Sequence, residues 1–148
     1  LNLENKVLYE SLYANVLDTF KSLIASIQLR DQYTEKHCHR VTKYAIDTAV
    51  AMGCSRADIE SLKISAALHD IGKIAIPDAV LLKNGRLTDQ EYEVIKTHSD
   101  IGERIIHSIA LFDRERAAIR HHHERWDGRG YPRVCKERKS LFWRESSL

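Results

Sequence analysis

Apolar side chains recur every three or four residues along most of the chain, which is the spacing of one face of a helix. The first such stripe consists of Leu3, Val7, Leu8, Leu12, Val16, Phe20, Leu23, Ile24 and Ile27. No stretch alternates convincingly between apolar and polar residues, as a half-buried strand would. The pattern therefore predicts an all-α protein that begins with one long helix.

Capping residues mark where the next two helices begin and end. A helix over residues 34–52 closes at Gly53, because glycine is favoured just past a helix C-terminus. Ser55, with Asp58 three residues later, predicts the start of a further helix that reaches Leu68.

Shorter elements and a second capping box follow. They are a helical turn after Pro77, a turn at Asn84-Gly85, a helix from about 88 to 101 or beyond, a helix over 113–123, and a loop broken by Gly128, Gly130 and Pro132. Thr88 and Glu91 have the spacing at which each side chain caps the backbone of the other.

Composition restricts the class of protein. A chain of 148 residues with 43% hydrophobic and 30% charged residues is typical of one soluble globular domain. No apolar run approaches the roughly 18 residues of a membrane span, and no signal peptide opens the chain. The three cysteines form no metal or redox pair, so we expect a reducing, cytoplasmic setting.

The charge is unevenly distributed. The net charge is +2, and residues 133–148 carry five basic and two acidic side chains. The rest of the chain is therefore slightly acidic, and we expect no binding to a nucleic acid polymer.

Eight histidines are many for this length and suggest metal or proton chemistry. The candidates lie on four separate predicted helices: His37, His69 beside Asp70, His98, and His122 with His123. Helical bundles build metal sites from such inward-facing ligands. Mixed imidazole and carboxylate ligands suit Fe, Mn, Zn or Ni better than Mg or Ca alone. Taken singly, each histidine fits a core or solvated role; the set together favours a metal site.

The same residues carry a resemblance to a known family. The matching segments are Tyr33-Thr34 with His37 and Arg40-Val41, His69-Asp70-Ile71-Gly72-Lys73, Pro77-Asp78 with Leu81 and Lys83, Leu87-Thr88 with Glu91, His98-Ser99-Asp100-Ile101-Gly102, and the run from His122 to Gly130-Tyr131-Pro132. In these segments the chain resembles the HD-GYP family, helical phosphodiesterases of the HD superfamily that hydrolyse cyclic di-GMP.

The resemblance implies a metal site of defined membership. Its ligands would be His37, His69, Asp70, His98, His122 and His123, holding two divalent ions, Fe or Mn first and Zn or Ni as alternatives. Asp70 would bridge the ions, a metal-bridging hydroxide would attack phosphorus, and Lys73 would face the scissile phosphate. A third metal is not expected, because Tyr33 stands where some members carry a glutamate.

The resemblance also assigns roles to the residues after the last helix. Gly128, Gly130, Tyr131 and Pro132 would shape a loop over the pocket that handles substrate and contacts diguanylate cyclase domains. Glu124 and Asp127 are candidates to orient histidine rings, with solvated loop positions as the alternative. His39, His107 and His121 match no ligand position of the family.

The chain departs from the family after Pro132. There the family continues with Gly-Leu-x-Gly-Glu-x-Ile-Pro-x-x-Ala-Arg-Ile and then an aspartate ligand. Codons for the residues after Arg133, read from the last base of the Arg133 codon, can spell that segment. We hypothesise a single-base deletion there, with simple divergence as the alternative. The C-terminal family helices and the aspartate would then be missing, which would weaken metal binding and activity.

These observations predict three segments: a long helix over 1–30, an HD-GYP core over 31–132, and a non-family tail over 133–148. The long helix suits a connection to an upstream sensor or receiver domain, or a seam between two copies of the chain. The main functional hypothesis is hydrolysis of a cyclic dinucleotide, cyclic di-GMP. The alternatives are a phosphohydrolase of another nucleotide and a catalytically inert module that binds cyclase domains.

Overall fold

A computed structural model describes residues 2–30, 32–107, 109, 113–125 and 127–132, with the side chains at 27, 28, 30 and 32–36 left out. Its elements are α1 (Leu3–Arg30), α2 (Gln32–Ala51), α3 (Arg56–Leu68), the 3-10 helix η1 (Ile71–Ala75), α4 (Asp78–Leu81), α5 (Asp89–His107) and α6 (Asp113–His121). This part of the chain contains no strand, so the all-α prediction is confirmed.

The predicted caps form as the sequence indicates. The Ser55 hydroxyl accepts a hydrogen bond from the backbone N–H of Asp58 at the start of α3. At α5 the capping box is reciprocal: the Thr88 N–H donates to Glu91 at 2.7 Å, and the Glu91 N–H donates to Thr88 at 3.2 Å. Each bond satisfies a backbone donor that the first helical turn leaves without an intrahelical partner.

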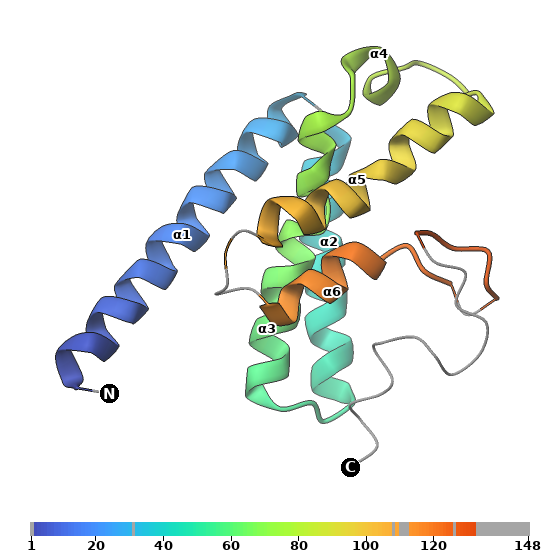
Figure 1. Ribbon diagram of the computed structural model, residues 1–148. Helices are drawn as coiled ribbons and strands as arrows, with labels where there is room; N and C mark the ends of the chain where they lie inside the picture. Colours follow the sequence, from blue (N-terminus) through green and yellow to red (C-terminus); the bar gives the residue numbers. More distant parts are fainter. Residues whose placement is uncertain (1, 31, 108, 110–112, 126, 133–148) are drawn as a thin grey trace.

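The later helices pack into a bundle around a small core. Helices α2 and α3 lie side by side and run in opposite directions (Figure 1). Helix α6 packs against α3 and α5, and α5 packs against η1. The buried core consists of Phe20, Ile24, Ile64, Leu68, Ile71, Ile106 and Ile119. Five elements contribute to this cluster, namely α1, α3, η1, α5 and α6, so it fixes how these elements are placed relative to one another.

Helix α1 divides into two halves with different environments. Phe20 and Ile24 are buried against the bundle, whereas Leu3 and Leu8 are 75% and 69% exposed. The N-terminal half extends away from the other helices (Figure 1). The apolar stripe therefore runs along one helix as predicted, but only its C-terminal part belongs to the core.

Two further predictions concern the last part of the chain, namely the end of α6 and the residues after Pro132. Helix α6 ends at His121, so the predicted extension to residue 123 is wrong, and His122 and His123 lie in the turn that follows. Residues 133–148, with the hypothesised deletion, lie outside the described residues. Among the described helices, none is long and apolar enough to cross a membrane.

Candidate metal centre

Four parts of the fold bring the six predicted ligands together. His37 lies on α2, and His69 caps the C-terminus of α3 with Asp70 directly after it. His98 lies on α5, and His122 and His123 follow α6. The neighbouring imidazole ring centroids lie between 4.1 and 5.8 Å apart. Residues separated by as much as 86 positions in the sequence thus meet in one cluster.

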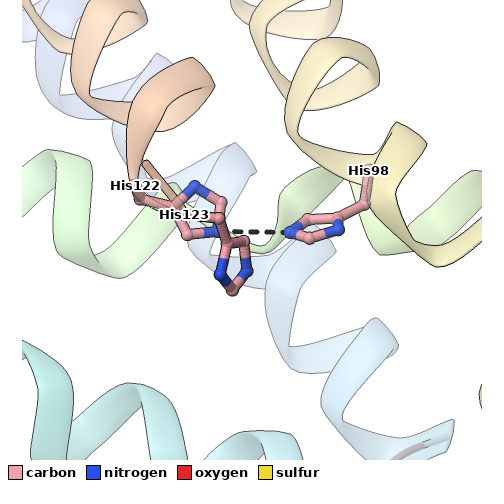
Figure 2. Close-up of side chains that lie close together, drawn as sticks. All are labelled: His98, His122 and His123. Carbon is pink, nitrogen blue, oxygen red and sulfur yellow. Dashed lines mark hydrogen bonds between the residues drawn. The ribbon is translucent and has the colours of Figure 1, made fainter. Parts of the chain in front are cut away.

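The cluster contains two groups of three side chains. One is His98, His122 and His123, and the other is His37, His69 and Asp70; within each group, the ligand atoms lie within 4.8 Å of one another. Figure 2 shows the first group, with His122 and His123 from the end of α6 approaching His98 from α5. Three nitrogen or oxygen atoms at this spacing can close on a single metal ion.

Backbone carbonyls fix how three of the rings present their nitrogens. The Nδ1–H groups of His69, His98 and His122 each donate, at 2.7 Å, to a carbonyl three residues earlier. A carbonyl oxygen only accepts hydrogen bonds, so the proton of each ring sits on Nδ1. The Nε2 atoms therefore point into the cluster as possible ligands, which is the arrangement that a metal-binding histidine needs.

Burial keeps most of these imidazoles neutral. Burial, together with neighbouring histidines, lowers the pKa of His122 to about 3 and that of His123 to about 4. Burial also lowers the pKa of His37 and of His98, against the opposing effect of Asp70. A neutral imidazole has a free lone pair at neutral pH, which is the form that binds a metal ion.

Two of the lone pairs face one another. His98 Nε2 and His122 Nε2 lie 3.2 Å apart, and both rings have their N–H on the opposite nitrogen (Figure 2). Two neutral rings in these tautomers have no hydrogen to share between these atoms. A hydrogen bond between these atoms would need an additional proton on one ring, whereas a bound cation would satisfy both lone pairs, so the geometry of the cluster fits a metal ion.

Asp70 lies between the two groups. Its Oδ2 is 3.2 Å from His69 Nε2, and its Oδ1 is 3.5 Å from His98 Nε2. Burial alone would raise the pKa of this carboxyl, but the hydrogen bonds and positive charges of His69 and Lys73 hold the pKa well below its usual range. The carboxylate is thus ionised, with one oxygen toward each group. The same contact raises the pKa of His69 despite its burial.

Lys73 lies at the edge of the cluster. Its Nζ donates to Asp70 Oδ2 at 2.8 Å, and its side chain is 18% exposed. Lys73 lies on the short η1 helix, which begins directly after His69 and Asp70. The positive charge therefore stands beside the ligand atoms and still reaches solvent.

Gly72 allows η1 to approach α5 closely. A Cβ at this position would collide with the His98 carbonyl group, and it would lie 2.6 Å from the Gly102 backbone nitrogen. A backbone neighbour cannot move away as a flexible side chain can. This contact brings Asp70 and His98 together. In the sequence, Gly72 stands out only as part of the family motif.

The loop after α6 folds back over its own histidines. The Tyr131 N–H donates to the His123 carbonyl at 3.2 Å, and a Cβ on Gly130 would collide with that carbonyl. Gly128 has a φ of 73°, in the left-handed region that glycine tolerates. The Tyr131 ring stacks on His123 with centroids 4.6 Å apart, and the Tyr131–Pro132 bond is cis.

The two acidic residues of this loop contact other groups. Glu124 Oε1 lies 2.6 Å from His121 Nδ1, and both side chains are 9% exposed. Asp127 accepts hydrogen bonds from Arg125 and from the Arg129 N–H. Among the contacts described, Glu124 therefore orients His121, and Asp127 stabilises the loop. Their predicted role toward the ligand histidines stays a prediction.

Comparison with known proteins supports the assignment of the motifs. Residues 21–139 match the model of a protein family that is described as "HD domain". The chain belongs to the HD domain family. Together with the relatives described below, this match confirms the resemblance to HD-GYP proteins within that family. The match extends past Pro132, and the predicted boundary at residue 132 stays a prediction.

Similar HD domain proteins come from several bacteria. The chain is 42% identical over 135 residues to a cyclic di-GMP phosphodiesterase of Thermotoga maritima, covering 88% of this chain and 35% of the relative. It is 41% identical to the cyclic di-GMP phosphodiesterase response regulator RpfG of Xanthomonas campestris, over 78% of this chain and 31% of the relative. It is 33% identical to 3'3'-cGAMP-specific phosphodiesterase 2 of Vibrio cholerae, over 89% of this chain and 26% of the relative. The chain thus spans about a third or less of these relatives.

Proposed function

We propose that this HD domain is a metal-dependent phosphodiesterase that hydrolyses cyclic di-GMP. The observation that carries the proposal is the pair of facing Nε2 atoms of His98 and His122, set within a cluster of six potential ligands. The names of the Thermotoga and Xanthomonas relatives supply the substrate class.

The two groups of side chains suggest two metal positions. His98, His122 and His123 would hold one ion, His37 and His69 the other, and Asp70 would offer one oxygen to each. The mixed imidazole and carboxylate donor set suits iron, manganese, zinc or nickel, and the family resemblance places iron or manganese first. Bound ions of this kind supply Lewis acidity and a water molecule of lowered pKa.

The protein's own side chains would bind and orient the phosphodiester. Lys73 already stands 2.8 Å from Asp70, so its ammonium group can pair with a phosphoryl oxygen placed at the cluster. Tyr131 stacks on one face of His123 and so limits the positions that this ring can take. The backbone hydrogen bonds of His69, His98 and His122 hold the ligand atoms in place before substrate arrives.

The first test is metal stoichiometry followed by turnover. The chain is loaded anaerobically with Fe²⁺ or Mn²⁺, metals per chain are counted by elemental analysis, and cyclic di-GMP hydrolysis is followed by chromatography. We expect two metals and formation of the linear dinucleotide. Two metals without turnover would contradict the enzymatic proposal and favour the inert, cyclase-binding alternative. One metal or none would contradict the two-metal site.

A second substrate is favoured by a specific relative. The Vibrio cholerae protein at 33% identity is named a 3'3'-cGAMP-specific phosphodiesterase. A panel of cyclic di-GMP, 3'3'-cGAMP and cyclic di-AMP, each at the same concentration, separates the two readings. Faster turnover of 3'3'-cGAMP would replace cyclic di-GMP as the proposed substrate.

A further inference from the structure

A chain of aromatic rings leads outward from the candidate metal centre. Tyr131 stacks on His123, with ring planes 22° apart, and meets the edge of Tyr92 with centroids at 6.4 Å. Tyr92 lies on α5, and the residue is 46% exposed to solvent. Two elements far apart in the sequence thus place an accessible aromatic ring next to the ring that covers a candidate ligand.

A positive charge lies over the same rings. Lys96 Nζ is 4.9 Å from the Tyr92 centroid and 6.0 Å from the Tyr131 centroid. Its side chain is 29% exposed and also pairs with Glu93 at 2.5 Å. Lys96 follows Tyr92 by one helical turn, so both side chains lie on the same side of α5. Lys96 is two residues before His98 in the sequence.

We propose that Tyr92, Tyr131 and Lys96 form a subsite for a guanine base of the substrate. The base stacks on Tyr92 while the phosphate attached to its nucleoside lies at the histidine cluster. Lys96 donates a hydrogen bond to the acceptor edge of the base. The inference rests on the proposed function, because it assumes that a nucleotide phosphate occupies the cluster.

Two physical arguments support this assignment. Aromatic side chains bind nucleobases by stacking, and Tyr92 remains 46% exposed although Lys96 lies over its ring. Guanine has two adjacent acceptors, O6 and N7, which lysine recognises, whereas adenine has a donor in place of O6. The subsite should therefore prefer guanine to adenine, and the preference should depend on Lys96.

The test measures binding to the Mn²⁺-loaded chain by calorimetry, with GMP, AMP, cyclic di-GMP and inorganic phosphate as probes. The variants are Tyr92→Ala, Tyr92→Phe and Lys96→Met, and Tyr9→Ala is the matched control, since Tyr9 is a 52% exposed tyrosine on the projecting half of α1. Metal content and thermal midpoint are measured for each variant, which shows that the centre and the fold are intact.

Tyr92→Ala should weaken GMP and cyclic di-GMP binding roughly tenfold, the size of one lost stacking contact, and leave inorganic phosphate binding unchanged. Tyr92→Phe and Tyr9→Ala should bind like the parent chain. Lys96→Met should reduce the affinity for GMP to that for AMP. Equal loss for GMP and phosphate, no loss for either, or a parent chain that binds no guanine nucleotide would each overturn the subsite. Tight, Tyr92-dependent binding without hydrolysis would support the subsite and contradict the proposed function.

Discussion

At the scale of single residues, one device recurs at the candidate centre. His69, His98 and His122 each donate Nδ1–H to the carbonyl three residues earlier in the chain. In a helical turn that carbonyl lies beneath the ring, so a histidine can reach it without distortion, as His98 does within α5. The bond directs Nε2 of each ring toward the cluster, although the rings lie on α5, at the end of α3 and in the turn after α6, and His69 Nε2 also contacts Asp70.

Removing one ring should therefore dismantle one metal group and spare the other. We expect His122→Ala to lower metal affinity by more than the 10–100-fold that loss of an outer-shell partner costs. The matched control is His107→Ala, because His107 is an exposed residue at the end of α5 outside both groups. Elemental analysis after dialysis measures the loss. Equal metal content in the two variants would contradict the assignment.

A second residue-scale prediction concerns Gly72. A methyl group at this position meets the His98 backbone, so Gly72→Ala should destabilise the fold by about 2 kcal/mol or more. Gly53→Ala is the control, because Gly53 has a positive φ but open space around it, and strain alone costs roughly 1–2 kcal/mol. Urea unfolding compares them. A smaller loss for Gly72→Ala than for Gly53→Ala would contradict the close packing of η1 on α5.

At the scale of elements, the beginning of α5 is held by several polar contacts. Lys83 pairs with Glu91 at 2.6 Å, and Glu91 also accepts the Thr88 N–H. The hydrogen bond from Lys83 contributes most, and the Thr88 N–H next, to lowering the pKa of Glu91 from 4.5 to about 2. The cap thus ties the loop after α4 to the first turn of the helix that carries His98.

The stability contributed by this cap should depend on pH. A carboxyl whose pKa is lower in the folded state stabilises the fold fully above its unfolded pKa, and loses that effect as the pH falls. For Glu91 the window runs from about pH 4.5 down to about 2. The difference in unfolding free energy between the parent chain and Glu91→Gln should therefore shrink across that window. Urea titrations at pH 6, 4 and 3 measure it, and a constant difference would refute the assignment.

The two halves of α1 should respond differently to the same kind of substitution. Phe20→Ala removes a buried ring from the core and should cost about 3–5 kcal/mol. Leu8→Ala, at a 69% exposed position, should stay within about 0.5 kcal/mol. Chemical unfolding of the two variants and of the parent chain measures these losses of unfolding free energy. A large loss for Leu8→Ala would mean that the projecting half is covered in solution, as the predicted seam between two chains requires.

At the scale of the whole molecule, the candidate centre joins four segments of the bundle, whereas α1 contributes to the core alone. Its six ligands come from α2, the end of α3, α5 and the turn after α6. In the described residues, α6 is also held to α5 by ion pairs, such as Arg116 with Glu103 at 2.7 Å. Two cations that together bind all four segments would therefore stabilise the folded bundle as a unit.

Metal binding should accordingly raise the thermal midpoint. At a free metal concentration 100 times the dissociation constant, linkage adds about 2.7 kcal/mol, which corresponds to several degrees for a chain of this size. Calorimetric scans with Mn²⁺ and after chelation measure the shift. The shift should disappear in a variant that combines His69→Ala and His122→Ala. An equal shift in that variant would mean that the metal acts elsewhere on the chain.

The sequence by itself determined the class of fold and most helix boundaries. Caps such as Ser55 and the Thr88–Glu91 box act within one turn of the backbone, so local residue types are sufficient to predict them. The family resemblance named the six candidate ligands, and the structure brings these side chains together, while their role as ligands stays a prediction. The α6 boundary was predicted two residues too long, since the turn that follows is stabilised by contacts with the loop beyond it.

Only the tertiary structure decided how the ligands are grouped and what surrounds them. The division into two groups, the position of Asp70 between them and the 3.2 Å approach of His98 to His122 depend on how the helices cross. The pairing of Glu124 with His121 and the neighbourhood of Tyr92 and Tyr131 arise in the same way. Spacing along a chain specifies which face of a helix a residue occupies, whereas packing of the core against Gly72 sets which faces meet.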